Sequence, residues 1–120
     1  MAKIMTVEDR PESLELVRKI LTKAGYEFVG CEDGEECLEK FVNEKPDLIL
    51  LDIMLPGMDG YEVYEQIKKL NKSQKIAFLS ALDISGRAQV RLFKLGTPAY
   101  ISKPFTPEEL LTKVAELLKK

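Results

Sequence analysis

Short apolar runs alternate along the chain with longer segments of helical periodicity, and this alternation limits the possible folds more than any other feature. Alternating strands and helices form βα units, whose strands pair in parallel. The strand-forming runs are KIMTV (3–7), EFVGC (27–31), DLILLD (47–52), KIAFLS (75–80) and AYIS (99–102). The third run is apolar at consecutive positions, which is typical of a central strand covered on both faces. The sequence therefore predicts an α/β fold around a five-stranded parallel sheet.

The helices between these runs begin and end at recognisable signals. Pro11 stands where a first helical turn tolerates proline, and Gly25 follows LVRKILTKA, where a left-handed residue ends a helix. Three further segments place Asp or Thr at an N-cap position with Glu three residues later: DGEE (33–36), DGYE (59–62) and TPEE (106–109). These segments predict helix starts at Asp33, Asp59 and Thr106.

The length and composition indicate one domain spanning residues 1–120. The chain has 18 Lys and Arg against 20 Asp and Glu, a net charge of -2, and no apolar stretch near the roughly 20 residues of a membrane helix. The first residues, MAKIMTVED, lack the long apolar core of a signal peptide. We therefore expect a cytoplasmic globular protein with no direct nucleic acid partner and no membrane partner.

Histidine is absent, and the chain has two cysteines, Cys31 and Cys37. Without histidine the chain cannot form a Ser-His or Cys-His catalytic pair or an imidazole metal site. The cysteine spacing does not match a metal motif, so we expect both thiols to be reduced and to lie in or near the core. Any catalysis would depend on carboxylates, lysine, hydroxyls or a metal ion.

Polar residues stand at the ends of four predicted strands. Glu8 and Asp9 follow the first strand, Asp52 ends the third, Ser80 ends the fourth, and Lys103 follows the fifth. Right-handed crossovers bring the carboxyl ends of parallel strands to one edge of the sheet, so these side chains should converge. Three neighbouring carboxylates repel one another unless cations share their site. Oxygen ligands with space for waters favour Mg²⁺, which together with Lys103 would compensate this charge.

Asp52 would then face partners suited to a phosphoryl group: a metal ion, a hydroxyl and an ammonium. Phosphoryl transfer needs mainly positioning and neutralisation of the phosphoryl oxygens, and carboxylates act as nucleophiles in other covalent phosphoryl transfers. The segment LPGMDG (55–60) supplies a tight turn, with the backbone carbonyl of Met54 able to face the metal. A lone acid at such a position is more often a helix cap or turn residue. The matched strand ends favour an acceptor role for Asp52.

The joint order and spacing of four motifs resemble the receiver domain of two-component response regulators. These motifs are VEDRP (7–11), LILLDIMLPGMDGYE (48–62), FLSA (78–81) and YISKPF (100–105), and the resemblance covers essentially the whole chain. It implies a flavodoxin-like, doubly wound (βα)5 fold with the strand order 2-1-3-4-5. It also implies a signalling switch that catalyses only its own phosphorylation and dephosphorylation, and is not otherwise an enzyme.

The resemblance implies a role for each matched acidic residue. Asp52 would be the phospho-acceptor, Asp9 a direct Mg²⁺ ligand, and Glu8 a ligand through water. Met54 would bind the same ion by its carbonyl oxygen. The phosphoryl donor would be a histidine kinase or a phosphotransfer protein.

The resemblance also implies how phosphorylation is read. Ser80 and Lys103 would contact the phosphoryl group, and the Lys103–Pro104 bond would be cis. Tyr100 would be the aromatic switch residue, although an aromatic side chain at a strand end is also common in ordinary packing.

The output would be a changed surface made by the fourth helix, the fifth strand and the fifth helix. This surface would bind a downstream effector protein or a fused effector domain, and phosphorylation-dependent dimerisation stays open. Within ISGRAQVRLFKLG (84–96), the residues Arg87, Arg91 and Lys94 would share one basic face. An ordinary solvated face is the equal alternative.

Several positions depart from the receiver pattern. Glu8 stands where Asp is commoner and Ser80 where Thr is frequent, and Pro98 precedes the fifth strand, where many relatives have polar residues. Met54 and Leu82 are apolar at two positions that flank the approach of the attacking water in this family. Because apolar groups cannot orient that water, the sequence predicts slow self-dephosphorylation.

Three other classes share parts of this pattern. Haloacid-dehalogenase-type phosphohydrolases carry a second Asp two positions after the nucleophile, where this chain has Met54. A flavodoxin-like electron carrier needs a phosphate loop rich in Ser, Thr and Gly after the first strand, whereas VEDRPES (7–13) places two acids, Glu8 and Asp9, directly after that strand. A receiver that acts as a phosphorylation-independent interaction module is disfavoured, because all five site residues are of competent type.

Overall fold

The computed structural model describes residues 1–81, 90, 94–96 and 98–120. The strands form one parallel sheet in the order β2-β1-β3-β4-β5. Its members are β1 (Lys3–Val7), β2 (Glu27–Cys31), β3 (Leu48–Asp52), β4 (Ile76–Ser80) and β5 (Ala99–Ser102). The predicted sheet and its strand order are confirmed, and β3 and β4 each begin one residue later than predicted.

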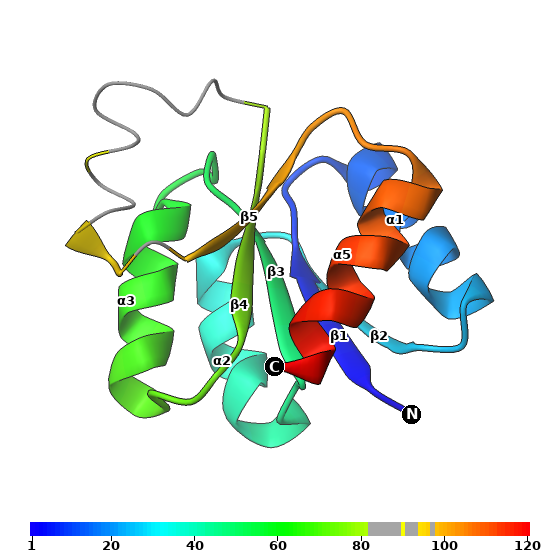
Figure 1. Ribbon diagram of the computed structural model, residues 1–120. Coiled ribbons are helices and arrows are strands. Elements are labelled where there is room, and N and C mark those ends of the chain that lie inside the picture. The colour runs from blue at the N-terminus through cyan, green and yellow to red at the C-terminus, as the bar shows by residue number, and fades with distance from the viewer. Residues whose placement is uncertain (82–89, 91–93, 97) are drawn as a thin grey trace.

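Helices cover both faces of the sheet, as a doubly wound fold requires (Figure 1). The helices α1 (Pro11–Lys23) and α5 (Pro107–Lys119) lie on one face, and α2 (Gly34–Glu44) and α3 (Gly60–Leu70) lie on the other. Most of the segment 84–96, in which the fourth helix and the basic face of Arg87 and Arg91 are predicted, lies outside the described residues.

The central strand β3 shows why its sequence is apolar at consecutive positions. All of its residues are buried. Successive side chains point to opposite faces of a strand, so Ile49 and Leu51 pack under α2 and α3, whereas Leu48 and Leu50 pack under α1 and α5. Both cysteines are buried free thiols, as predicted, on the face covered by α2 and α3.

The predicted helix starts carry the expected N-caps. The Asp33 carboxylate accepts the N–H of Glu36 at 2.8 Å, and the Asp59 carboxylate accepts the N–H of Glu62 at 3.0 Å. Thr106 and Glu109 form a full capping box. At α2 the bond from the third helical residue back to the cap differs from a capping box. The Glu36 carboxylate accepts the N–H of Glu32, one residue before the N-cap, at 2.7 Å. The local signals therefore set where these helices begin.

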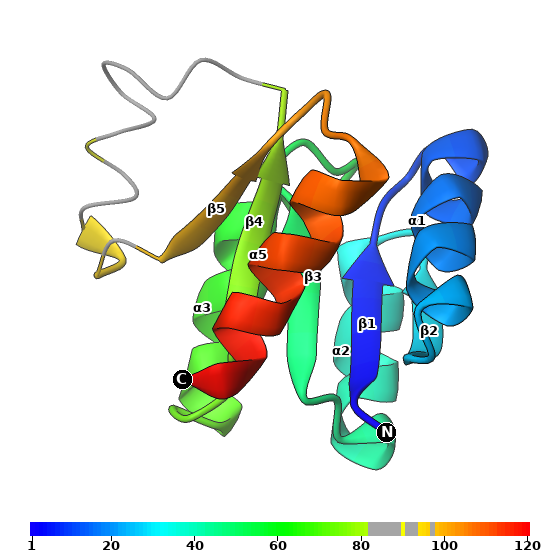
Figure 2. The same ribbon diagram turned by 45° about the vertical axis from the view of Figure 1, so that its right-hand side comes forward.

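The carboxyl ends of the parallel strands lie at one edge of the sheet, and both chain termini lie toward the opposite edge (Figure 2). The turns that follow β1 and β3, and the segment that follows β5, therefore come together at the carboxyl edge. Among the described residues, no helix has the length and apolar character needed to cross a membrane.

Candidate functional site

Three carboxylates meet at the carboxyl edge, as predicted from the strand ends. Glu8 and Asp9 directly follow β1, and Asp52 is the last residue of β3. One oxygen from each of the three lies within 4.8 Å of the others. Glu8 is 1% exposed and Asp52 is 7% exposed, whereas Asp9 lies at the surface. The site is therefore a pair of buried acids with a third acid open to solvent.

Lys103 joins the two buried acids. Its ammonium donates to Glu8 Oε2 at 2.5 Å and to Asp52 Oδ2 at 3.0 Å. Its backbone N–H donates to the carbonyl of Ser80 at 2.7 Å, which anchors the segment after β5 to the end of β4. The side chain of Lys103 is 21% exposed, so its contacts with the acids are partly shielded from water.

Burial and the contacts between these side chains shift the pKa values of Glu8 and Lys103. Desolvation raises the pKa of Glu8 from 4.5 to about 6, because it outweighs the hydrogen bond from Lys103, and the neighbouring Asp52 adds to the increase. Burial alone would lower the pKa of Lys103, but the hydrogen bonds to Glu8 and Asp52 outweigh it, and the pKa of Lys103 rises. The single positive charge of Lys103 thus does not fully compensate the negative charge of the carboxylates. The remaining negative charge favours binding of a further cation.

The turn after β3 fixes the orientation of Asp52. Its Oδ1 accepts the N–H of Met54 at 2.9 Å, and the N–H of Gly60 donates to the carbonyl of Ile53 at 2.9 Å. A Cβ at Gly60 would lie 2.4 Å from the carbonyl oxygen of Asp52, so only glycine lets α3 begin this close to β3. The Met54 side chain points away from the core and is 64% exposed.

The two predicted switch residues occupy neighbouring strands. Ser80 is the last residue of β4 and is buried, and Tyr100 is half-buried on β5, in register with Phe78 of β4. The Lys103–Pro104 peptide bond is cis, as the resemblance implies. The roles of Ser80 and Tyr100 in switching stay predictions.

A cleft of about 630 Å³ opens over the acidic site. Its lining includes Glu8, Asp52 and Lys103, and also Arg10 and Ser13, which are not among the site residues predicted from the sequence. Both follow Asp9 closely, so their position in the turn after β1 is the signal that could have identified them. Arg10 is exposed and adds a permanent positive charge beside the acids.

The residues of the site fit a magnesium ion. The buried oxygen Oε1 of Glu8 has no hydrogen-bond partner among the described residues. Buried carboxylate oxygens are almost always paired, and a hydrated cation would satisfy this one. Three carboxylates at this spacing, one of them open to solvent, match the oxygen ligands and retained waters that Mg²⁺ prefers.

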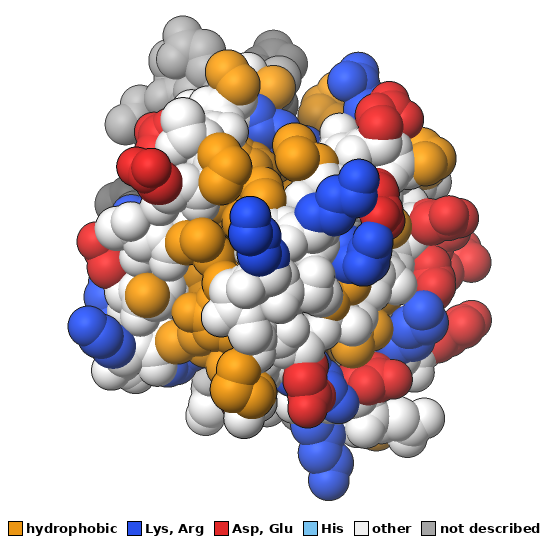
Figure 3. Space-filling model, turned by 90° about the vertical axis from the view of Figure 1, so that its right-hand side faces the viewer, with side chains coloured by type: hydrophobic (Ala, Val, Ile, Leu, Met, Phe, Trp, Pro, Cys, Tyr) orange, Lys and Arg blue, Asp and Glu red, His pale blue; other side chains and the backbone are white. Residues whose placement is uncertain are grey.

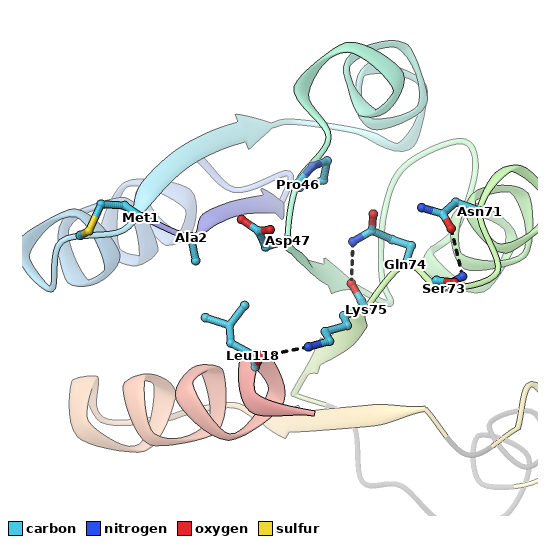
Figure 4. A pocket seen from close by; sticks show the side chains of 9 residues that line it. All are labelled: Met1, Ala2, Pro46, Asp47, Asn71, Ser73, Gln74, Lys75 and Leu118. Carbon is cyan, nitrogen blue, oxygen red and sulfur yellow. Dashed lines mark hydrogen bonds between the residues drawn. The ribbon is translucent and has the colours of Figure 1, made fainter.

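A second hollow lies at the opposite edge of the sheet, near the chain termini (Figure 4). Its polar side chains bond to the protein itself: Lys75 donates to the carbonyl of Leu118 at 3.0 Å, and Gln74 donates to the carbonyl of Lys75 at 3.1 Å. The acidic cluster and Lys103 lie instead at the carboxyl edge, where the candidate site is.

Known proteins match the chain over nearly its full length. The family model of the response regulator receiver domain matches residues 4–115. The alkaline phosphatase synthesis transcriptional regulatory protein PhoP of Bacillus subtilis (strain 168) is 38% identical over 118 residues, which cover 98% of this chain and 49% of PhoP. The chain spans about half the length of the curated relatives it matches.

Solved structures show the same fold. The chemotaxis protein CheY4 of Vibrio cholerae superposes with a TM-score of 0.91 at 29% identity, over 98% of both chains. The response regulator TrrA of Thermotoga maritima, solved in complex with Mg(2+)-BeF, superposes with a TM-score of 0.87 at 38% identity, over 98% of this chain and 99% of TrrA. Since the family model and these relatives cover nearly all of the sequence, the chain belongs to the response regulator receiver domain family.

Proposed function

We propose that the chain is a phosphorylation-dependent signalling switch of a two-component system, with Asp52 as the phospho-acceptor. The observation that carries this proposal is the environment of the Asp52 carboxylate. One oxygen accepts from the Met54 N–H and the other from the Lys103 ammonium, beside two further acids. The carboxylate is therefore held in a fixed orientation at the base of an open cleft.

Mg²⁺ is the cofactor that the site would hold, through Glu8, Asp9, Asp52 and the carbonyl oxygen of Met54. When bound, it would neutralise negative charge on the carboxylates and on the incoming phosphoryl oxygens. The spacing of the acids supports this proposal, as does Glu8 Oε1, which lacks a hydrogen-bond partner in the part of the chain that the structure describes. The Mg(2+)-BeF complex of TrrA supports it as well.

The acceptor chemistry follows from the position of Asp52. A carboxylate oxygen of Asp52 would bond to the phosphorus of a phosphohistidine while the P–N bond breaks and the donor imidazole leaves. Lys103 would keep its proton and attract the phosphoryl oxygens, because its raised pKa maintains the ammonium form. The given sequence contains no histidine, so the donor would be a histidine kinase or a phosphotransfer protein.

Phosphorylation would be read through Ser80, Lys103 and Tyr100. The acyl phosphate brings about -1.5 to -2 charges in place of one, with additional acceptor oxygens. The Ser80 hydroxyl at the end of β4 would move toward these oxygens, and Tyr100 on the neighbouring strand would turn into the space that Ser80 and its loop leave. A local change of charge would thus alter the surface formed by α4, β5 and α5, with α4 within residues 84–96.

The described part of this surface carries apolar side chains suited to a protein partner. On the face with α1 and α5, hydrophobic side chains gather in a band over α5 (Figure 3). Two half-buried residues, Leu111 and Leu118, lie within α5, and a third, Phe105, lies just before the helix begins. Contiguous apolar surface of this kind marks interaction sites. The partner would be a downstream effector protein or a fused effector domain. Residues 1–120 would form a single receiver domain that acts in the cytoplasm.

Intact mass spectrometry tests the acceptor role. After incubation with Mg²⁺ and acetyl phosphate, we expect a labile phosphate adduct on the wild type and none on Asp52→Asn or in the presence of a chelator. The variant Asp47→Asn, an exposed acid at the opposite edge, should be labelled like the wild type. A folded wild-type protein that binds Mg²⁺ but acquires no adduct would favour a phosphorylation-independent interaction module.

Loss of the phosphoryl group should be slow. Met54 presents an exposed apolar side chain beside Asp52 and cannot orient an attacking water, and Leu82, the second apolar position, lies outside the described residues. We expect the double variant Met54→Asn/Leu82→Gln to lose its phosphate faster than the wild type in Mg²⁺ at neutral pH. The decay of the adduct by mass spectrometry measures this rate, and equal rates for the two proteins would contradict the prediction.

A further inference from the structure

Two buried side-chain oxygens have no hydrogen-bond partner among the described residues: Thr6 Oγ1 and Glu8 Oε1. Thr6 is fully buried in β1, and Glu8 is 1% exposed. Buried polar groups are nearly always paired with protein or ordered water, so each unpaired oxygen calls for a partner. Neither oxygen bonds directly to the other, so a further group, such as a water molecule, would have to pair with them.

Thr6 faces the side of the sheet that is covered by α1. Its neighbours Met5 and Val7 belong to the apolar cluster under α2 and α3, whereas Ile4 belongs to the cluster under α1 and α5. Because side chains alternate along a strand, Thr6 points to the same side as Ile4. The pairing in the sheet agrees: a Cβ at Gly30, the register partner of Thr6, would lie 3.4 Å from Leu14 of α1.

Glu8 continues this alternation beyond the end of β1. Its N–H donates to the carbonyl of Cys31 at 3.0 Å, which extends the pairing with β2 by one residue. Glu8 therefore follows Thr6 on the same side of the sheet, two residues further along. Its other carboxylate oxygen, Oε2, is held by Lys103, so Oε1 is the oxygen left to turn toward Thr6.

The separation of the two residues suits a single water molecule. Residues two apart on a strand have Cα atoms about 6.6 Å apart. A water that makes two hydrogen bonds of roughly 2.8 Å reaches across about 5.5 Å. The flexible Glu8 side chain can bring its carboxylate closer to Thr6 and so make up the difference between these two distances. The hydroxyl of Thr6 can donate a hydrogen bond to the water or accept one from it.

We propose that one buried water molecule bridges Thr6 Oγ1 and Glu8 Oε1, and that Thr6 is thereby a positioning residue for the Glu8 carboxylate. With Oε2 bonded to Lys103 and Oε1 bonded to this water, both oxygens of Glu8 are held, and Oε1 keeps a second lone pair for a water of the hydrated cation. This restraint matters for a glutamate, whose side chain has one more rotatable bond than aspartate. The inference rests on the proposed Mg²⁺ site, whose ligands Glu8 would help to orient.

Two substitutions at Thr6 distinguish the effect of its hydroxyl from the effect of its side-chain shape. Thr6→Val keeps the shape but removes the hydroxyl, and Thr6→Ser keeps the hydroxyl. We expect Thr6→Val to weaken Mg²⁺ binding roughly tenfold by calorimetry, as loss of a supporting hydrogen bond at a metal site typically does. Thr6→Ser should bind Mg²⁺ nearly as the wild type does. Thr22→Val is the matched control, since its hydroxyl bonds within α1, to the Arg18 carbonyl at 2.7 Å.

A crystal structure of the metal-free protein supplies a readout that does not depend on Mg²⁺. We expect an ordered water between Thr6 and Glu8 in the wild type and in Thr6→Ser, and none in Thr6→Val. No water in the wild type would overturn the inference, as would a Thr6→Val variant that is more stable and binds Mg²⁺ unchanged. If the water is present but the wild type binds no Mg²⁺, the proposed metal site fails and the positioning role of Thr6 fails with it, whereas the bridge stands.

Discussion

Glu8 is the residue at which burial and charge conflict most directly. Its side chain is nearly inaccessible, and desolvation outweighs the attraction of Lys103, so the pKa of Glu8 rises to about 6. In the metal-free protein the ionised form of Glu8 is thus less favourable in the folded state than in the unfolded chain. The Glu8 carboxylate lies where it can help to bind a cation, and its burial lowers the stability of the metal-free protein.

Replacing Glu8 by glutamine should therefore stabilise the metal-free protein. An increase of the pKa from 4.5 to about 6 corresponds to about 2 kcal/mol at pH 7, and this value already includes the attraction of Lys103. The cost is fully present above pH 6, falls as the pH decreases through 6, and vanishes below 4.5, where both states are protonated. Urea unfolding in chelator at pH 7.5 and pH 4.5 measures the difference.

The control for this prediction is a glutamate that is exposed to solvent and not buried like Glu8. Glu65→Gln, on the exposed side of α3, should change the free energy of unfolding by less than about 0.5 kcal/mol at either pH. A Glu8→Gln variant that is less stable than the wild type at pH 7.5 would show that the ion pair with Lys103 outweighs the desolvation of Glu8.

At the scale of elements, the turn between β3 and α3 determines the geometry of the acceptor. Two glycines in this turn serve different purposes. Gly57 has a φ of +73°, and a Cβ there would lie within 4 Å of none of the described residues beyond its chain neighbours, whereas Gly60 lies against the backbone of Asp52 and Ile53. One glycine is needed for its conformation and the other for its lack of a side chain.

Alanine substitutions at these glycines should have separable effects. Gly60→Ala would place a Cβ 2.4 Å from the Asp52 carbonyl oxygen, so the start of α3 must shift, with an expected loss of about 1–3 kcal/mol in the free energy of unfolding. Because Asp52 shifts with it, labelling by acetyl phosphate should slow. Gly57→Ala should cost about 1–2 kcal/mol through its left-handed conformation but label at the wild-type rate. Equal labelling of both variants would contradict this distinction.

At the scale of the whole molecule, the site joins elements that are distant in sequence. Lys103 reaches Glu8 across 95 positions and Asp52 across 51, so the end of β5 is attached to the ends of β1 and β3. An ion bound by these acids in the folded state alone would stabilise the entire fold, since the unfolded chain does not assemble the site.

Mg²⁺ should accordingly raise the free energy of unfolding of the whole domain. At a concentration of 100 times its dissociation constant, we expect about 2.7 kcal/mol of added stability. The double variant Asp9→Asn/Asp52→Asn, which lacks two of the three acids, should show almost none of it. Thermal unfolding in MgCl₂, compared with NaCl of the same ionic strength, measures the effect. An equal increase in NaCl would indicate general screening of the acids.

The sequence alone determined the features that depend on neighbouring residues. Strand runs, the N-caps at Asp33, Asp59 and Thr106, and the left-handed Gly25 follow from local periodicity and capping, and the structure has them nearly where they were predicted. The convergence of the acids with Lys103 was also predictable, because parallel strands place all their carboxyl ends at one edge.

Only the tertiary structure decided the features that depend on burial and distant contacts. These are the raised pKa of Glu8, the close approach of Gly60 to Asp52, the position of Arg10 and Ser13 in the cleft, and a Thr6 hydroxyl that meets no hydrogen-bond partner in the described part of the chain. Desolvation and packing depend on residues from several elements at once. No local pattern around Thr6 or Glu8 reports which groups the folded chain brings to them.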